Sequence, residues 1–264
     1  MTRKLRSITN KLAPLLFVAL LLIVWQGVCM AGWVPKFMLP SPVDVVKAFI
    51  GDFKNLIAQA GTTLTEAIVG LSVGVLLAFC MAFLMDRFDL LNKSIYPLLI
   101  ISQTIPTVAI APLLVLWLGY DMAPKIVLII IVCFFPITVG LLEGFRSADR
   151  DTVNLMRAMG SSKWQIFKYV KFPASLGRFF AGLRISVSYS VVGAVISEWL
   201  GGYGGLGVYM TRVRKSFAFD KMFAVILLIS IISLLLMKGV ALLQKAVMPW
   251  TRHTLAKSGE SEND

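Results

Sequence analysis

Six long apolar stretches divide the chain, and this division limits its possible folds more than any other feature. The stretch 12–34 contains no Asp, Glu, Lys or Arg. A helix rises about 1.5 Å per residue, so roughly 20 apolar residues cross the hydrocarbon core of a bilayer. Only 15% of the residues are charged, whereas about 25% is usual in soluble domains. The sequence therefore predicts an all-α protein that crosses a membrane several times.

Six transmembrane helices are predicted, at about 12–34, 62–85, 94–120, 125–145, 179–200 and 222–244. They form one transmembrane domain over 12–244, with an N-terminal arm at 1–11 and a polar tail at 245–264. The basic residues before the first stretch are also typical of a signal peptide, but Trp25, Gln26 and Trp33 interrupt the small-residue cleavage region. We therefore interpret it as a retained span. Arg184 and Glu198 lie near the ends of the fifth span, where we expect both side chains to reach the interfaces.

The distribution of Lys and Arg predicts the orientation of the chain. The N-terminal arm, the 86–93 loop, the 146–178 loop and the tail together hold 16 Lys or Arg, and the loops on the other side hold seven. Positive residues gather on the cytoplasmic side of membrane proteins. The bias therefore places both termini and the 146–178 loop in the cytoplasm, although the cluster at 212–215 runs against it.

Residues for catalysis or metal binding are not evident. The glycine-rich segment 201–207, GGYGGLG, lacks the lysine of a phosphate-binding loop, so we expect no ATP hydrolysis by this chain. Cys29, Cys80 and Cys133 lie far apart inside apolar stretches, which indicates small core residues rather than metal ligands. The net charge of +12 is accounted for by basic loops and does not require a nucleic-acid partner. We expect no catalytic residue, no metal and no cofactor on this chain.

The third and fifth spans carry polar residues at positions that suggest two alternatives. Ser102, Gln103, Thr104 and Thr107 surround Pro106, and a proline inside a helix removes one backbone hydrogen bond and kinks the chain. We expect this patch to face the protein interior, since an unpartnered Gln in lipid is costly. In the fifth span, one helical face holds the small residues Ser186, Ser190 and Gly193. Both sets either pack helices together or line a solute path.

The basic, amphipathic loop between the fourth and fifth spans has the pattern of two short helices that meet at Gly160. Asp151 or Thr152 is expected to begin the first helix, and Ser161 or Ser162 to cap the second. Trp164, Phe167 and Val170 recur every three residues, with Ile166 beside them, and Pro173 is expected to end the second helix. An alternative is a helix that lies flat on anionic lipid.

This loop resembles the EAA loop of ABC importer permeases, in which a Glu-Ala-Ala triplet precedes a glycine and a hydrophobic segment ends in proline. Here the triplet positions hold Asn154, Leu155 and Met156, whereas Ala158, Gly160 and the ending Val170 to Pro173 fit the pattern. Further blocks resemble the nitrate/sulfonate/taurine branch of these permeases, which pyrimidine thiamine-precursor permeases share. They are "LPSPVDVV" at 39–46, "TLTEAIVGLSVG" at 63–74, "QTIPTVAIAPLLVLWLG" at 103–119, "FFPITVGLLEGFRS" at 134–147 and "GLRISVSYSVVGAVISEWLGGYGGLG" at 182–207. "MDRF" at 85–88 and "EWLGG" at 198–202 favour the pyrimidine permeases.

The resemblance implies a type I ABC importer permease fold in the bacterial inner membrane. Two copies would pair, with the solute path between them, and the 151–173 loop would dock in cytoplasmic subunits that hydrolyse ATP. An extracytoplasmic binding protein would deliver a pyrimidine thiamine precursor, a sulfonate such as taurine, or nitrate. The residues expected to contact the ATPase are Asn154, Leu155, Met156, Ala158, Gly160, Trp164, Phe167 and Pro173, and those expected in the path are Ser102, Gln103, Thr104, Pro106, Ser186 and Ser190.

Two other functions are alternatives to an ABC importer. An ion-coupled secondary transporter would need buried acids and inverted repeats. We expect no buried acid inside the spans, because Asp86, Asp121, Glu143 and Glu198 lie at span ends, and no repeat is convincing. A membrane scaffold without transport would not account for a polar third span broken by prolines.

Overall fold

The computed structural model describes residues 2–35 and 37–250, with side chains described from residue 12 onward except at 15 and 36. Within these residues the chain is helical and contains no β-strand. The helices are α1 (Thr2–Met30), α2 (Pro42–Gly51), α3 (Phe53–Arg87), α4 (Asp89–Ser102), α5 (Thr107–Leu118), α6 (Met122–Arg146), α7 (Arg150–Ala158), α8 (Lys163–Ile166), the π-helical turn η1 (Phe167–Lys171), α9 (Phe172–Leu200), α10 (Leu206–Lys215) and α11 (Phe219–Val247).

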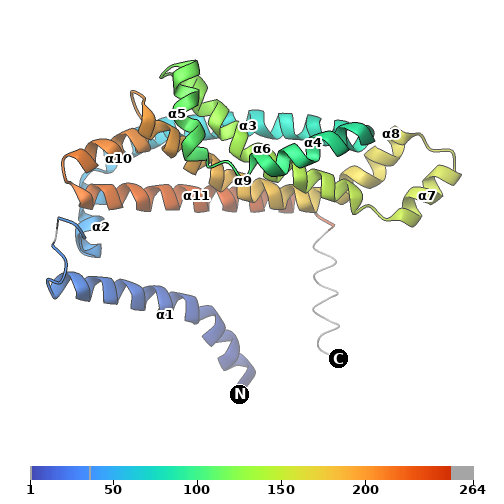
Figure 1. Cartoon of the computed structure of the whole chain (residues 1–264). Helices are drawn as coiled ribbons and strands as arrows, with labels where there is room; N and C mark the ends of the chain where they lie inside the picture. The colour runs from blue at the N-terminus through green and yellow to red at the C-terminus, as the bar shows by residue number, and fades with distance from the viewer. Residues whose placement is uncertain (1, 36, 251–264) are drawn as a thin grey trace.

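The long helices α3, α6, α9 and α11 lie side by side, with α4 and α5 along the side of this bundle and the other short helices at its two ends (Figure 1). At one end α7 and α8 project beyond the long helices, and we call residues 150–166 the elbow. At the other end lie α2 and α10, and α1 stands apart from the bundle. Most of α1 is exposed, and apolar side chains such as Phe17 and Ile23 cover it, as expected for a surface that meets lipid.

The helices lie close to the predicted spans, with one departure. In the part of the chain that the structure describes, five helices are long and apolar enough to cross a membrane, and the third predicted span, 94–120, is instead the pair α4 and α5, bent by 100° at a short break. The predicted arm at 1–11 is not a separate segment, because α1 begins at Thr2. Residues 251–264 of the predicted tail lie outside the described residues.

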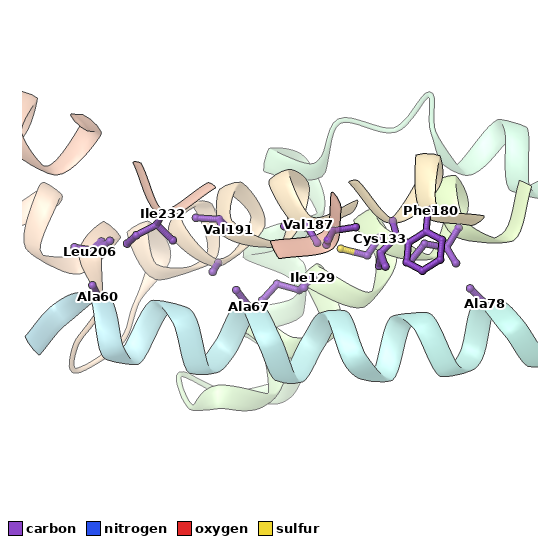
Figure 2. Close-up of a cluster of buried hydrophobic side chains, with 14 of the residues drawn as sticks. Ala60, Ala67, Ala78, Ile129, Cys133, Phe180, Val187, Val191, Leu206 and Ile232 are labelled. Atoms are coloured by element: carbon purple, nitrogen blue, oxygen red, sulfur yellow. The ribbon is translucent and has the colours of Figure 1, made fainter. Parts of the chain in front are cut away.

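Small residues bring α6 and α9 into close contact along much of their length. A Cβ atom on Gly182 would lie 2.5 Å from the carbonyl oxygen of Pro136, and one on Gly144 would lie 2.6 Å from Cα of Ser175. Small residues at helix interfaces allow backbones to approach, as is usual among membrane helices. In the same way α3 presents Ala67 and Ala78, both fully buried, to the apolar side chains of its neighbours (Figure 2). The centre of the core therefore consists of α3, α6 and α9 packed through small residues, and α10 and α11 add further buried apolar side chains.

We predict that Gly182→Leu strongly lowers the stability of the bundle. The added side chain has no room against the Pro136 carbonyl, and overpacking typically costs about 1–3 kcal/mol and more where backbone must move. Thermal unfolding of the purified protein in detergent measures the effect. Gly239→Leu on α11 is the matched control, because nothing lies within 4 Å of a Cβ at Gly239. Equal transition temperatures for the two variants would show that the α6–α9 contact is looser than described.

Candidate coupling elbow and translocation groove

The first helix of the elbow is capped by Asp149. Its carboxylate accepts hydrogen bonds from the backbone N–H groups of Asp151 and Thr152, both at 3.2 Å, and from the Thr152 hydroxyl at 2.6 Å. The predicted start at Asp151 or Thr152 is therefore wrong, because Asp149 is placed to bond the free amides of the first turn. The same hydrogen bonds, that from the Thr152 hydroxyl above all, hold the pKa of Asp149 below its usual value.

The two helices of the elbow join at Gly160, as predicted. Gly160 has a φ of +80°, a left-handed conformation that favours glycine. Its N–H donates to the carbonyl of Arg157 at 3.0 Å, and the N–H of Ser161 donates to the carbonyl of Met156 at 2.9 Å. This pair of bonds is the Schellman motif that ends many helices. Ser162 then caps α8 in a capping box with Gln165, which confirms the second of the two predicted caps.

Pro173 does not end the second helix, which corrects the prediction. Helical structure continues from Lys163 to Leu200 through the π-turn η1, and Pro173 lies in the first turn of α9. The N–H of Phe172 donates to the carbonyl of Phe167, five residues back. We attribute the tolerance of Pro173 to this widened turn.

The elbow is fixed to the long helices through η1, the turn that follows it directly, by aromatic contacts and one ion pair. The buried ring of Phe167 lies edge-on to Phe83 of α3, at 4.9 Å between centroids, and to Phe145 of α6, at 5.2 Å. Lys171 Nζ lies 2.7 Å from Asp86 Oδ1 at the end of α3. A force on the elbow would therefore act directly on α3, α6 and α9.

The outer face of the elbow is apolar and exposed. Leu155, Met159 and Trp164 expose 62%, 76% and 60% of their surface. Large apolar side chains outside the spanning helices indicate a docking surface. Met156 instead packs inward against the small cluster of Ala148, Val153 and Ile166. Of the residues predicted to contact the ATPase, the exposed ones are Asn154, Leu155, Ala158, Gly160 and Trp164, while Phe167 is buried and Met156 and Pro173 are half-buried.

The polar patch of the third span lies at the surface of the chain, not in its interior as predicted. The chain leaves the helical conformation between α4 and α5, because Pro106 has no N–H to donate and disfavours helical geometry in the residue before it. Gln103, Thr104 and Pro106 are exposed and Ser102 is half-buried. The hydroxyls of Ser102 and Thr104 donate to backbone carbonyls three residues back, at 2.7 and 2.8 Å. Because these hydroxyls have local partners, the patch can be exposed.

A groove of about 390 Å³ runs from Gln103 along α6 and α9. Its walls include Pro136, Gly140 and Gly182 from the close contact of these helices, and the half-exposed Ile185 and Tyr189. At its elbow end Arg178 is paired with Glu143 at 2.7 Å. The groove therefore combines apolar walls with a few polar groups, as small-molecule sites do.

Ser186 and Ser190 lie where helices pack together. This is the first of the two alternatives for the fifth span, and the second is a solute path. Ser186 is fully buried and its hydroxyl donates to the carbonyl of Cys133 on α6 at 3.0 Å. Ser190 is 1% exposed, and its hydroxyl donates to the carbonyl of Val187 at 2.8 Å. Neither side chain reaches an open surface of the single chain.

A buried charged network joins four helices at the end of the bundle opposite the elbow. Lys125 of α6 donates to Oε1 of Glu66 on α3 at 2.6 Å. Nearby, Glu198 at the end of α9 accepts from the Thr63 hydroxyl at 2.7 Å and from the N–H of Gly207 on α10 at 2.5 Å. The three charged residues expose 5% of their surface or less. Two carboxylates and one ammonium therefore hold α3, α6, α9 and α10 together.

This network corrects two predictions. Glu198 does not reach an interface, and Glu66 is an acid buried inside the predicted second span. A charge inside a span is costly and needs a partner, so the single Glu within 62–85 was the signal that could have revealed the network. Arg184 is half-buried and donates to Gln244 of α11, so it too does not extend freely to the interface. The segment 201–207 follows α9 and covers the network, because a Cβ on Gly202 or Gly205 would contact Lys125 or Glu198.

The helical bundle, its bent helix pair and its surface groove define an all-α permease of the membrane. The family described as binding-protein-dependent transport system inner membrane component matches residues 70–253. The chain belongs to this family, so it is the permease subunit of an ABC importer. Membership implies separate ATPase subunits, which hydrolyse the ATP, and a binding protein as partners.

Similar proteins cover nearly the whole chain. The formylaminopyrimidine transport permease protein ThiX of Halalkalibacterium halodurans is 34% identical over 243 residues, which are 91% of this chain and 96% of ThiX. A probable ABC transporter permease protein of Haemophilus influenzae is 38% identical over 85% of this chain and 92% of its own length. A crystal structure of an amino acid ABC transporter has a similar fold, with a TM-score of 0.60 at 14% identity over 75% of this chain and 95% of that chain.

Proposed function

We propose that two copies of this chain pair across the groove and enclose the solute path between them. The groove is open on the surface of the single chain, and one end of it lies at the break beside Gln103. An exposed Gln in a membrane-spanning region needs a polar partner or water. A second copy would close the groove and supply Gln103 with a polar partner and with water in the enclosed path. Ser102, Thr104 and Pro106 lie beside Gln103 in the proposed path, and Ser186 and Ser190 support its wall from behind.

The elbow carries the coupling part of the proposal. It combines an exposed apolar face at Leu155 and Met159 with a firm attachment to α3 and α6 through Phe167. In this proposal the face docks in a cleft of the ATPase, and ATP-driven closure moves the elbow and reorients the spans, as alternating access requires. The excess of Lys and Arg on the elbow side supports a cytoplasmic elbow and cytoplasmic termini in a bacterial cell.

A pyrimidine precursor is the proposed solute. ThiX, at 34% identity, is named a formylaminopyrimidine permease. The groove lining is consistent with an uncharged polar ring, because Gln103 and Tyr189 offer an amide and a phenol. Arg178, which could attract a sulfonate or nitrate, is already paired with Glu143. Taurine and nitrate are therefore less well matched to this lining than a pyrimidine.

Capture of the ATPase tests the coupling proposal. We expect the double variant Leu155→Glu, Met159→Glu to retain at most about a tenth of the ATPase that the unchanged permease retains, because two buried apolar contacts of about 1.5–3 kcal/mol each would be lost. The measurement is co-purification from detergent with the ATPase subunit of the same importer. Tyr203→Glu is the control, since Tyr203 is 90% exposed and lies just before α10, the helix at the opposite end of the bundle (Figure 1). Unchanged capture by the double variant would rule out docking through this face.

A further inference from the structure

Two hollows meet where the elbow joins α3, and their linings differ in character. One, of about 370 Å³, is lined by Phe79 and Phe83 of α3, by Trp164, Phe167 and Phe172, and by Lys168 at the side. The other, of about 620 Å³, contains Arg87, Arg157, Lys163 and Lys171 together with Asp86. Phe83, Trp164 and Phe167 line both. An aromatic groove therefore opens beside a basic pocket.

The basic pocket carries an excess of positive charge. Lys171 is paired with the one acid of the lining, Asp86, at 2.7 Å. Among the residues that the structure describes, Arg87, Arg157 and Lys163 are in no ion pair. Three guanidinium or ammonium groups without a counter-ion, gathered in one hollow, attract a phosphate strongly.

The aromatic groove opens on a surface that meets lipid. Leu76 lies three residues before Phe79 and seven before Phe83, so all three share one face of α3. Leu76 is 64% exposed, and Leu77 and Val73 beside it are exposed as well. Exposed aliphatic side chains on a spanning helix face hydrocarbon. A ligand that enters the groove from this face has an apolar body, and its charged end can reach the basic pocket.

We propose that this place is a binding site for one anionic phospholipid. An acyl chain lies against Phe79, Phe83 and Phe172, and the phosphate lies among Arg87, Arg157 and Lys163. Basic pockets at the ends of membrane helices recognise anionic head groups in this way. The lipid joins α3 to the elbow and so helps to fix the elbow's position. This proposal concerns the permease alone and does not depend on ATPase docking.

Native mass spectrometry of the full-length protein tests the site, with phosphatidylglycerol and phosphatidylcholine of the same acyl chains as probes. We expect phosphatidylglycerol to be retained at least about tenfold better, because the basic residues near the head group attract an anionic lipid and not a zwitterionic one. The double variant Arg87→Gln, Lys163→Gln should lose most of this preference. The control Arg214→Gln, Lys215→Gln removes the same charge from exposed positions at the other end of the bundle.

Two further arms separate a lipid site from a phosphate site. Dihexanoyl phosphatidylglycerol has the same head group with short chains, and we expect it to bind at least about tenfold more weakly, because it buries far fewer CH₂ groups in the aromatic groove. Inorganic phosphate at millimolar concentration should not displace the long-chain lipid. Equal binding of the short-chain lipid, displacement by phosphate, or full retention of the lipid by the double variant would each overturn the proposal. The short-chain comparison uses the unchanged protein, so it decides the matter even if the double variant does not fold.

Discussion

Replacing Lys125 by Met is expected to lower the transition temperature of the purified permease by roughly 10 °C. Lys125 is 5% exposed and donates to Glu66, itself 2% exposed, at 2.6 Å. Within the described residues neither Glu66 nor Glu198 is ion-paired with another Lys or Arg. Removing one partner of a buried ion pair typically costs about 3–5 kcal/mol, because the other charge remains buried and unpaired. For a chain of this size each kcal/mol changes the transition temperature by about 2–4 °C.

Two controls distinguish this effect from a general loss of charge. Lys93→Met removes an ion pair with Asp89 whose side chains are 75% and 74% exposed, and such pairs contribute only about 0–1 kcal/mol. The double variant Lys125→Met, Glu66→Leu removes both charges and should recover most of the loss. If Lys125→Met unfolded at the temperature of the unchanged protein, the buried network would not hold the helices together as described.

Gly160→Val is expected to reduce solute uptake by the assembled importer about tenfold or more. Gly160 has a φ of +80°, and a β-branched residue held there costs about 1–3 kcal/mol. If the elbow can adopt another conformation, a cost of that size reduces the population of its native conformation by roughly one to two orders of magnitude. Nothing lies within 4 Å of a Cβ at this position, so the expected effect comes from the backbone and not from a clash.

Gly160→Asn is the matched control, because asparagine tolerates the left-handed conformation far better than valine. We expect this variant to keep most of the uptake. Membrane insertion and thermal stability of both variants should remain close to those of the unchanged protein, because the elbow lies outside the bundle. Full uptake by Gly160→Val would show that the shape of the elbow is not needed for coupling.

The sequence predicted best what depends on local or strongly periodic patterns. Apolar length located the helices, and Gly160 and Ser162 were recognised because a left-handed glycine and a helix cap are local features. The start of α7 differs from the predicted one because Asp149, Asp151 and Thr152 all suit a helix start, and the structure shows that Asp149 accepts from the free amides. The sequence predicts a helix end at Pro173 because the π-turn that accommodates this proline has no clear sequence signal.

Features that depend on distant parts of the chain were not predicted. The contact of Glu66 with Lys125 spans 59 residues, and the contact of Thr63 with Glu198 spans 135. No local pattern identifies these partners, although a lone acid inside a span indicates that a partner exists.

The 100° bend between α4 and α5 exceeds the expected proline kink, because the chain leaves the helical conformation over several residues. The bend placed Gln103 on the surface, where the sequence had predicted the interior.

Uptake by proteoliposomes tests whether this chain imports a pyrimidine precursor at the expense of ATP. Vesicles are prepared with this chain, with its neighbouring ATPase and with its binding protein, and a labelled pyrimidine precursor is supplied outside with ATP enclosed. We predict that the labelled precursor accumulates only when all three proteins and hydrolysable ATP are present. An unlabelled pyrimidine should compete with its uptake, and taurine should not. Accumulation driven by a proton or sodium gradient in vesicles that contain this chain alone would contradict the account.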